Sequence, residues 1–193
     1  MRVFVVYCHP SDESFTHDAK ESFLKGLSDA GHSVEVSDLY KMDFCGDFDR
    51  SQYDRDAYYR SDLPISQDII SEQKKINAAD AIVFIYPVFW TEAPAKLVGW
   101  FQRVWTFGFA YGEDRTMKQL EKALFIATMG GSLKEDIRQR QVEAMKTVML
   151  GDRISDRAKT AEMIVFDEMS RECRTEETMA HFLETAYNAG KNF

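Results

Sequence analysis

Short apolar runs, separated by segments with helical spacing, constrain the fold of this chain more than any other feature of its sequence. Continuous runs occupy residues 3–7, 81–85 and 123–128, and weaker ones occupy 33–36 and 163–166. Strands that are apolar at nearly every position are typical of a parallel sheet with helices on both faces. The alternation therefore predicts an α/β fold, a doubly wound parallel sheet of five strands.

Apolar residues recur at helical spacing between these runs. In the first such segment, Phe15, Phe23 and Leu27 are separated by multiples of four residues, and Gly31 suits the position just after the helix. Further helices are expected around Ile69 and Ile76, with Ser66 as a cap, and over 94–105, 135–150 and 175–190. Five strands connected in this way predict the flavodoxin-like order 2-1-3-4-5, with a crevice beyond the carboxyl ends of strands 1 and 3.

The composition suits one domain over residues 1–193, since 45% of the residues are hydrophobic and 29% are charged. A net charge of −8 argues against binding to nucleic acid or to an anionic membrane surface. No apolar run is long enough to span a bilayer. Because the chain begins directly on a strand, we expect no signal peptide. The three cysteines form no CxxC pair or zinc pattern. We therefore expect a cytoplasmic protein without a metal site.

Residues 45–64 are the one irregular insert, and they are long for a connection between two elements. The insert is either a functional or mobile segment or a solvated acidic loop, and the sequence leaves both interpretations open.

The loop after the first strand, residues 8–16, carries His9, Ser14 and Thr16 and leads into a helix. A helix start offers unpaired N–H groups that favour a phosphate. The loop matches neither the GxGxxG pattern nor a Walker loop. Ser14 either caps the helix or helps to bind a phosphate, and both interpretations stay open.

Two more loops at the same edge of the predicted sheet contain residues suited to a flat ligand. The stretch YPVFWTEAP (86–94) places Trp90 in a loop, whereas Trp100 and Trp105 fall in the following helix and are expected to pack. The stretch TMGGS (128–132) has two glycines, which let backbone approach a ligand closely. A phosphate loop, an aromatic wall and a Gly-Gly edge together indicate a nucleotide with a large planar ring, such as a flavin.

Several motifs resemble those of the flavodoxin-like NAD(P)H:quinone oxidoreductases. They are HPSDESFT (9–16), SDLY (37–40), the block from EQKK to FAYG (72–112) and MGGS (129–132), and the resemblance fades beyond residue 132. It implies that flavin phosphate and ribityl groups lie near His9, Ser14, Phe15 and Thr16. The ring edge is implied at Pro87, Val88, Phe89, Trp90 and Thr91, and the pyrimidine end at Thr128, Met129, Gly130 and Gly131. The resemblance also implies that Phe109, Ala110 and Tyr111 line the substrate site from the partner subunit of a homodimer. Trp90 is expected to contact the flavin edge or the substrate at that site.

The resemblance implies that NAD(P)H gives a hydride to flavin N5, after which a quinone or similar acceptor takes two electrons. Larger relatives carry a Tyr and a His shortly after the Gly-Gly pair, but residues 132–141 contain neither, so no catalytic acid–base residue is predicted. The missing C-terminal extension favours FMN, with FAD as the alternative. Azo- or nitro-compound reduction, or a non-catalytic role as electron carrier or transporter subunit, also remain open.

The apolar composition of one helix is a second reason to expect a homodimer. The helix over 94–105 bears Leu97, Val98, Phe101 and Val104 with few polar residues, so we expect an exposed apolar side that a second copy covers.

Overall fold

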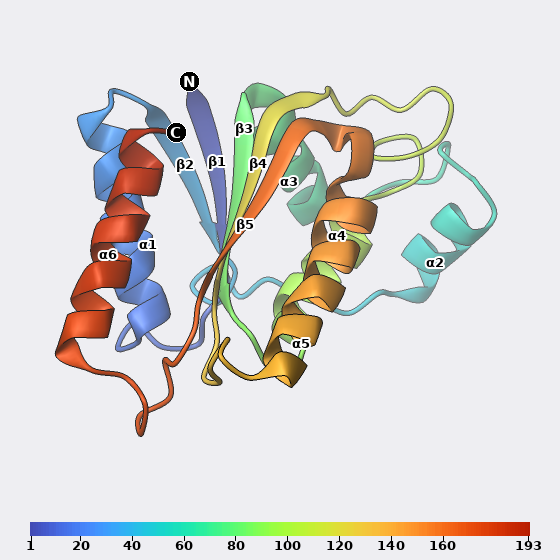
Figure 1. Cartoon of the computed structure of the whole chain (residues 1–193). Helices are drawn as coiled ribbons and strands as arrows, with labels where there is room; N and C mark the ends of the chain where they lie inside the picture. Colours follow the sequence, from blue (N-terminus) through green and yellow to red (C-terminus); the bar gives the residue numbers. More distant parts are fainter.

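The computed structural model describes residues 1–193 as a parallel sheet between two helical layers (Figure 1). The strands are β1 (Arg2–Tyr7), β2 (Ser33–Asp38), β3 (Ala81–Pro87), β4 (Leu120–Thr128) and β5 (Ala158–Phe166). The helices are α1 (Phe15–Asp29), α2 (Arg50–Ala57), α3 (Gln67–Ala78), α4 (Ala95–Val104), α5 (Asp136–Lys146) and α6 (Glu176–Lys191). The order is β2-β1-β3-β4-β5, and all pairs are parallel, which confirms the predicted fold and strand order.

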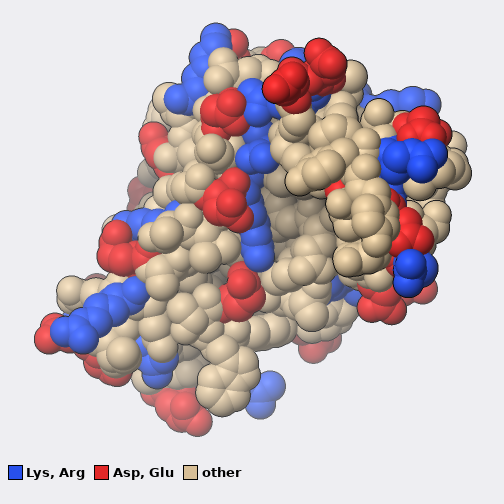
Figure 2. Space-filling model, turned by 90° about the vertical axis from the view of Figure 1, so that its right-hand side faces the viewer, with Lys and Arg blue, Asp and Glu red and all other residues tan.

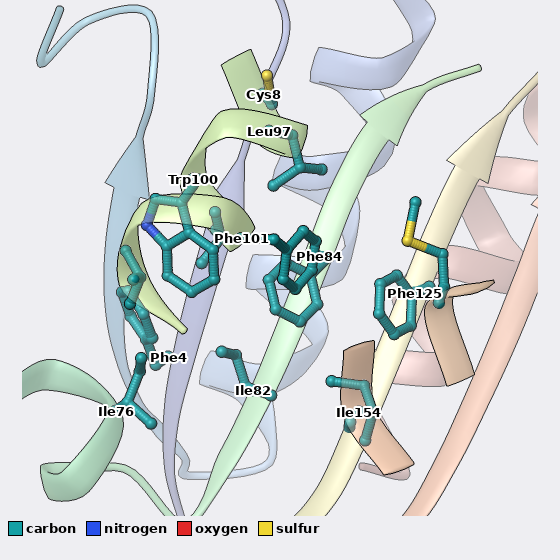
Figure 3. Packing of buried hydrophobic residues seen from close by; sticks show 14 of the residues in the cluster. Phe4, Cys8, Ile76, Ile82, Phe84, Leu97, Trp100, Phe101, Phe125 and Ile154 are labelled. Carbon is teal, nitrogen blue, oxygen red and sulfur yellow. The ribbon is translucent and has the colours of Figure 1, made fainter. Parts of the chain in front are cut away.

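The central strand, β3, is buried at every position because helices cover both of its faces. On one face, Phe84 stacks on Phe125 with ring centroids 4.8 Å apart, and Trp100 of α4 meets the edge of Phe84 at 5.6 Å (Figure 3). On the other face lie α1 and α6, with Phe182 and Leu183 of α6 packed against the core.

Two glycines allow α1 and α6 to approach closely. A Cβ atom at Gly26 would collide with the Tyr187 carbonyl oxygen, and one at Gly190 would collide with the Phe23 carbonyl oxygen. The two backbones therefore touch where the helices cross, which fixes α6 against α1.

The prediction that the helix over 94–105 exposes an apolar side is wrong. Leu97, Trp100 and Val104 are fully buried within the subunit. The insert 45–64 covers α4, because Gly46 packs directly on Gly99, where a Cβ atom would collide with the Gly46 carbonyl oxygen.

The insert is also more regular than predicted, since it contains α2. Asp49 caps this helix by accepting a hydrogen bond from the Gln52 N–H, and the buried Arg55 donates to the Phe107 carbonyl. Gln52 donates in turn to the Arg103 carbonyl of α4. These buried polar contacts hold the insert against the body of the protein.

Two other boundaries differ from the prediction. The helix expected over 135–150 ends at Lys146 and continues as a π-helix, Thr147–Ile154. β5 begins at Ala158, before the apolar run at 163–166, because its first half is a partly exposed edge with polar residues. No helix in the structure is both long enough and apolar enough to cross a membrane.

Candidate functional site

The loops that follow β1, β3, β4 and β5 meet at one edge of the sheet, at the bottom of Figure 1. They enclose a cavity of about 350 Å³. It is lined by His9, Glu13, Ser14, Phe15, Thr16, Pro87, Val88, Phe89, Thr128, Met129, Gly130, Met169, Ser170, Arg171 and Arg174. The structure thus brings together most of the predicted site residues. Trp90, Thr91 and Gly131 do not line this cavity.

The first loop is ordered by its own hydrogen bonds. His9 Nδ1 lies 3.0 Å from the Ser11 amide nitrogen and 2.8 Å from its carbonyl oxygen, so the backbone fixes the imidazole. Burial lowers the pKa of His9, which favours the neutral ring. Ser14 accepts from the His17 N–H at 3.2 Å, which confirms its role as a helix cap.

A cap at Ser14 is compatible with anion binding beside it. The N–H groups of Phe15 and Thr16 occupy the first two positions of α1, where no acceptor exists within the helix. Both residues line the cavity. The Thr16 hydroxyl lies 2.7 Å from the Thr128 hydroxyl and connects the first loop to the one after β4.

The loop after β3 makes a tight turn beside the cavity. The Phe89 N–H donates to the Glu92 carbonyl at 2.9 Å, and the Glu92 N–H donates back at 3.1 Å. Trp90 lies at the tip with a φ of 63° and is 96% exposed. A left-handed φ is a strained conformation for a large side chain. The turn therefore presents an indole ring to solvent next to the cavity.

The Gly-Gly edge has two different environments. Gly130 lines the cavity and faces Ser170, whereas the Arg138 guanidinium covers Gly131 so closely that a Cβ atom there would clash with it. The Gly131 carbonyl accepts from the Glu168 N–H at 3.0 Å. Arg138 thus fills the position over Gly131 that the sequence assigns to a ligand.

Sequence reasoning missed the loop after β5. Ser170, Arg171 and Arg174 from this loop line the cavity. A signal was present, because two arginines follow the fifth strand at the same sheet edge in a chain with a net charge of −8. They add positive charge close to the α1 N-terminus.

The segment Phe109–Tyr111 lies elsewhere. The Met117 N–H donates to the Phe109 carbonyl, and Asn77, just before β3, donates to the Thr116 carbonyl. This segment is therefore at the opposite, amino edge of the sheet, at the upper right of Figure 1. One chain alone does not bring Tyr111 to the cavity.

Tyr111 instead borders a hollow of about 430 Å³ together with Phe48, Asp56, Gln102 and Trp105. The hollow is on the side that carries α2, the side turned to the viewer in Figure 2, where uncharged surface is flanked by mixed charges. Burial, and to a lesser degree Asp56, raises the pKa of Tyr111, so its hydroxyl stays protonated.

A family model for the flavodoxin-like fold matches residues 1–152. The solved structure of an NAD(P)H:quinone oxidoreductase from Methanothermobacter marburgensis is 37% identical, with a TM-score of 0.93 over 100% of this chain and 96% of that one. The chain belongs to the flavodoxin-like NAD(P)H:quinone oxidoreductase family.

Two further relatives match the chain over a shorter stretch or at a lower sequence identity. NAD(P)H dehydrogenase [quinone] 1 of Cavia porcellus is 37% identical over 150 residues, which is 68% of this chain and 54% of that protein. The chain thus spans about half the length of this curated relative. General stress protein 14 of Treponema denticola, solved in complex with FMN, shares the fold at 18% identity, with a TM-score of 0.71 over 100% of this chain and 98% of that one.

Proposed function

We propose that this protein is a flavin-dependent NAD(P)H oxidoreductase that uses FMN and reduces a quinone or a similar flat acceptor. The observation that carries the proposal is the cavity where the loops after β1, β3, β4 and β5 converge. Its residues match the family motifs at the carboxyl edge of the sheet, where this fold class binds ligands. Flavin bound there would supply two-electron chemistry, with hydride taken from NAD(P)H at N5 and electrons passed to the acceptor.

The residues of the cavity fit a flavin phosphate. The free N–H groups at Phe15 and Thr16 and the side chains of Arg171 and Arg174 form an anion-binding set. We assign the phosphate to these groups, with Ser14 keeping the helix start in place. His9, held by the Ser11 backbone, has the role of a neutral binding residue and not that of a base.

The ring system fits between the other two loops. Pro87, Val88 and Phe89 provide one wall, and Thr128 to Gly130 provide the other. In this arrangement the Gly130 N–H, which donates to no group of the chain, is placed to orient the ring and to stabilise negative charge on it, whereas the Val88 and Phe89 N–H groups donate to the Thr128 and Glu92 carbonyls. Trp90 and Thr91 lie at the rim, so we assign Trp90 to the acceptor rather than to the ring.

The choice of FMN rests on size and on fold. The cavity holds about 350 Å³. A protein with the same fold binds FMN. FAD remains the alternative cofactor.

We also propose a homodimer, because the substrate segment Phe109–Tyr111 and the cavity lie at opposite edges of the sheet in one chain. In a two-fold dimer, the segment of one copy reaches the cavity of the other. The hollow beside Tyr111, lined by Phe48 and Trp105, then forms part of the substrate site.

The test begins with the purified protein and its melting temperature in FMN and in FAD. A ligand that binds only the folded state must raise that temperature, so no shift with either flavin contradicts the proposal. Oxidation of NADH and NADPH is then followed with a quinone, an azo dye and a nitroaromatic. Fast turnover with the quinone supports the proposed acceptor. Preference for the azo dye or the nitroaromatic would make that compound the acceptor instead of the quinone. Bound flavin without turnover of any acceptor would favour a role as electron carrier.

A further inference from the structure

The turn Phe89–Glu92 is held in a conformation that its sequence does not favour. Trp90 has a φ of 63°, yet a two-residue turn that needs a positive φ normally has glycine or asparagine there. Such a residue persists only where the surrounding structure restrains it. The cross-turn hydrogen bonds between Phe89 and Glu92 restrain the backbone at its base. The remaining restraint comes from outside the turn.

Glu92 connects the turn to a second element. Its Oε1 atom accepts from the Ala93 N–H at 2.9 Å and lies 3.4 Å from a guanidinium nitrogen of Arg153. The Glu92 side chain is 47% exposed, whereas that of Arg153 is only 14% exposed. The ion pair is thus formed between a partly solvated carboxylate and a largely buried cation.

Arg153 is itself fixed by its neighbours. Its guanidinium lies 4.9 Å from the centre of the Phe101 ring and 3.1 Å from the Met149 sulfur. Its carbonyl accepts from the Trp105 indole N–H at 2.6 Å. Arg153 belongs to the π-helix Thr147–Ile154, a type of helix that is frequent at functional sites. It is therefore a rigid anchor attached to α4, while the turn it contacts is at the rim of the cavity.

We infer that Arg153 is a positioning residue which, through Glu92, holds the Phe89–Glu92 turn over the cofactor cavity, an inference that rests on the proposed function. Arg153 does not line the cavity and touches no reacting atom. Its effect reaches the acceptor through Phe89, which lines the cavity, and through Trp90 at the rim. A fixed indole holds a flat acceptor in a narrow range of orientations, and a loose one does not.

The first test needs no flavin. Hydrogen–deuterium exchange of the peptide covering residues 87–93 is compared among flavin-free variants. Arg153→Met keeps the stem packed on Phe101 and removes the charge, so exchange in this peptide is expected to become about tenfold faster. Glu92→Gln is expected to do the same, and Arg153→Lys to stay near the native rate. The matched control is Arg115→Met, which breaks the Arg115–Asp156 pair (2.8 Å) away from the turn and should leave this peptide unchanged.

The second test uses protein loaded with flavin. For Arg153→Met and Glu92→Gln, KM for the quinone is expected to rise about tenfold while kcat changes less than threefold, and the double variant is expected to be no worse than either single one. In a Trp90→Ala background, Glu92→Gln should have no further effect on KM. Unchanged exchange in residues 87–93, or equal and additive losses in kcat, overturns the inference. Failure to bind any flavin overturns the proposed function instead, and the exchange measurement still decides the role of Arg153.

Discussion

Tyr86 and Trp100 lie in the same hydrophobic core but differ in whether their polar atoms make hydrogen bonds. The Tyr86 hydroxyl is buried without a hydrogen-bond partner, whereas the Trp100 indole N–H donates to the buried Glu72 carboxylate at 2.8 Å. A buried polar group that makes no hydrogen bond lowers the free energy of unfolding. Removing the donor of a hydrogen bond to a buried charged group lowers that free energy by more, because the charge is left without a partner.

Tyr86→Phe is therefore expected to leave the free energy of unfolding unchanged or to raise it by up to about 1 kcal/mol. Trp100→Phe is expected to lower it by about 2–3 kcal/mol, because it leaves the Glu72 carboxylate short of a donor. Urea unfolding of both variants measures this. A loss above 1 kcal/mol for Tyr86→Phe would mean that the hydroxyl has a partner in solution, such as a buried water.

Two substitutions at Trp90 distinguish an effect on stability from an effect on quinone turnover. Glycine adopts a φ of 63° without strain, so Trp90→Gly is expected to be more stable than Trp90→Ala by about 1 kcal/mol. Both variants lose the indole and are expected to lose quinone turnover by a similar factor, with flavin content retained. If alanine proves as stable as glycine, the turn does not keep this conformation in solution.

At the scale of helices, the crossing of α1 and α6 depends on glycine. Gly26→Ala is expected to lower the free energy of unfolding by about 1–3 kcal/mol, because its Cβ meets the Tyr187 backbone. Gly151→Ala is the control, since nothing lies within 4 Å of a Cβ there, and it should be neutral or slightly stabilising. Guanidinium or urea midpoints decide between them, and equal midpoints would show that α6 shifts freely over α1.

The elements show what the sequence could predict and what it could not. The strands and their order follow from apolar runs such as 81–85, since only a doubly covered parallel sheet accommodates them. The insert helix α2, RSQYDRDA, has no apolar face and is held by buried polar contacts of Gln52 and Arg55 that become visible only in three dimensions. The same limit hid the covering of α4, because the residues that bury it come from the distant segment 45–64.

Site residues could be predicted where they belong to a recognisable motif. They could not be predicted where only the three-dimensional structure brings them to the cavity. His9 to Thr16 and Pro87 to Phe89 were found because their residue types suggest a ligand. Arg171 and Arg174 reach the cavity only because β5 ends beside β4, which spacing along the chain does not reveal. The Glu92–Arg153 contact joins residues 61 positions apart and has no local signal.

For the whole molecule, the decisive question is whether two chains share each site. The cavity and the segment Phe109–Tyr111 lie at opposite edges of the sheet, so a monomer should bind flavin and still lack part of its substrate site. Light scattering at micromolar concentration is expected to show a dimer. Tyr111→Ala is expected to retain flavin and to reduce quinone turnover, because the ring it contributes belongs to the other copy's site.

Complementation between two defective chains tests this arrangement directly. One chain carries Tyr111→Ala, and the other carries Arg171→Glu with Arg174→Glu, which places negative charge where the flavin phosphate is proposed. In a mixed dimer one site combines an intact cavity with an intact Tyr111, and the other site has both defects. Random pairing makes half of the dimers mixed, each with one of two sites intact, so co-expression should restore about a quarter of native turnover. If co-expression restores nothing, or if a monomer is fully active, Tyr111 does not act across the interface.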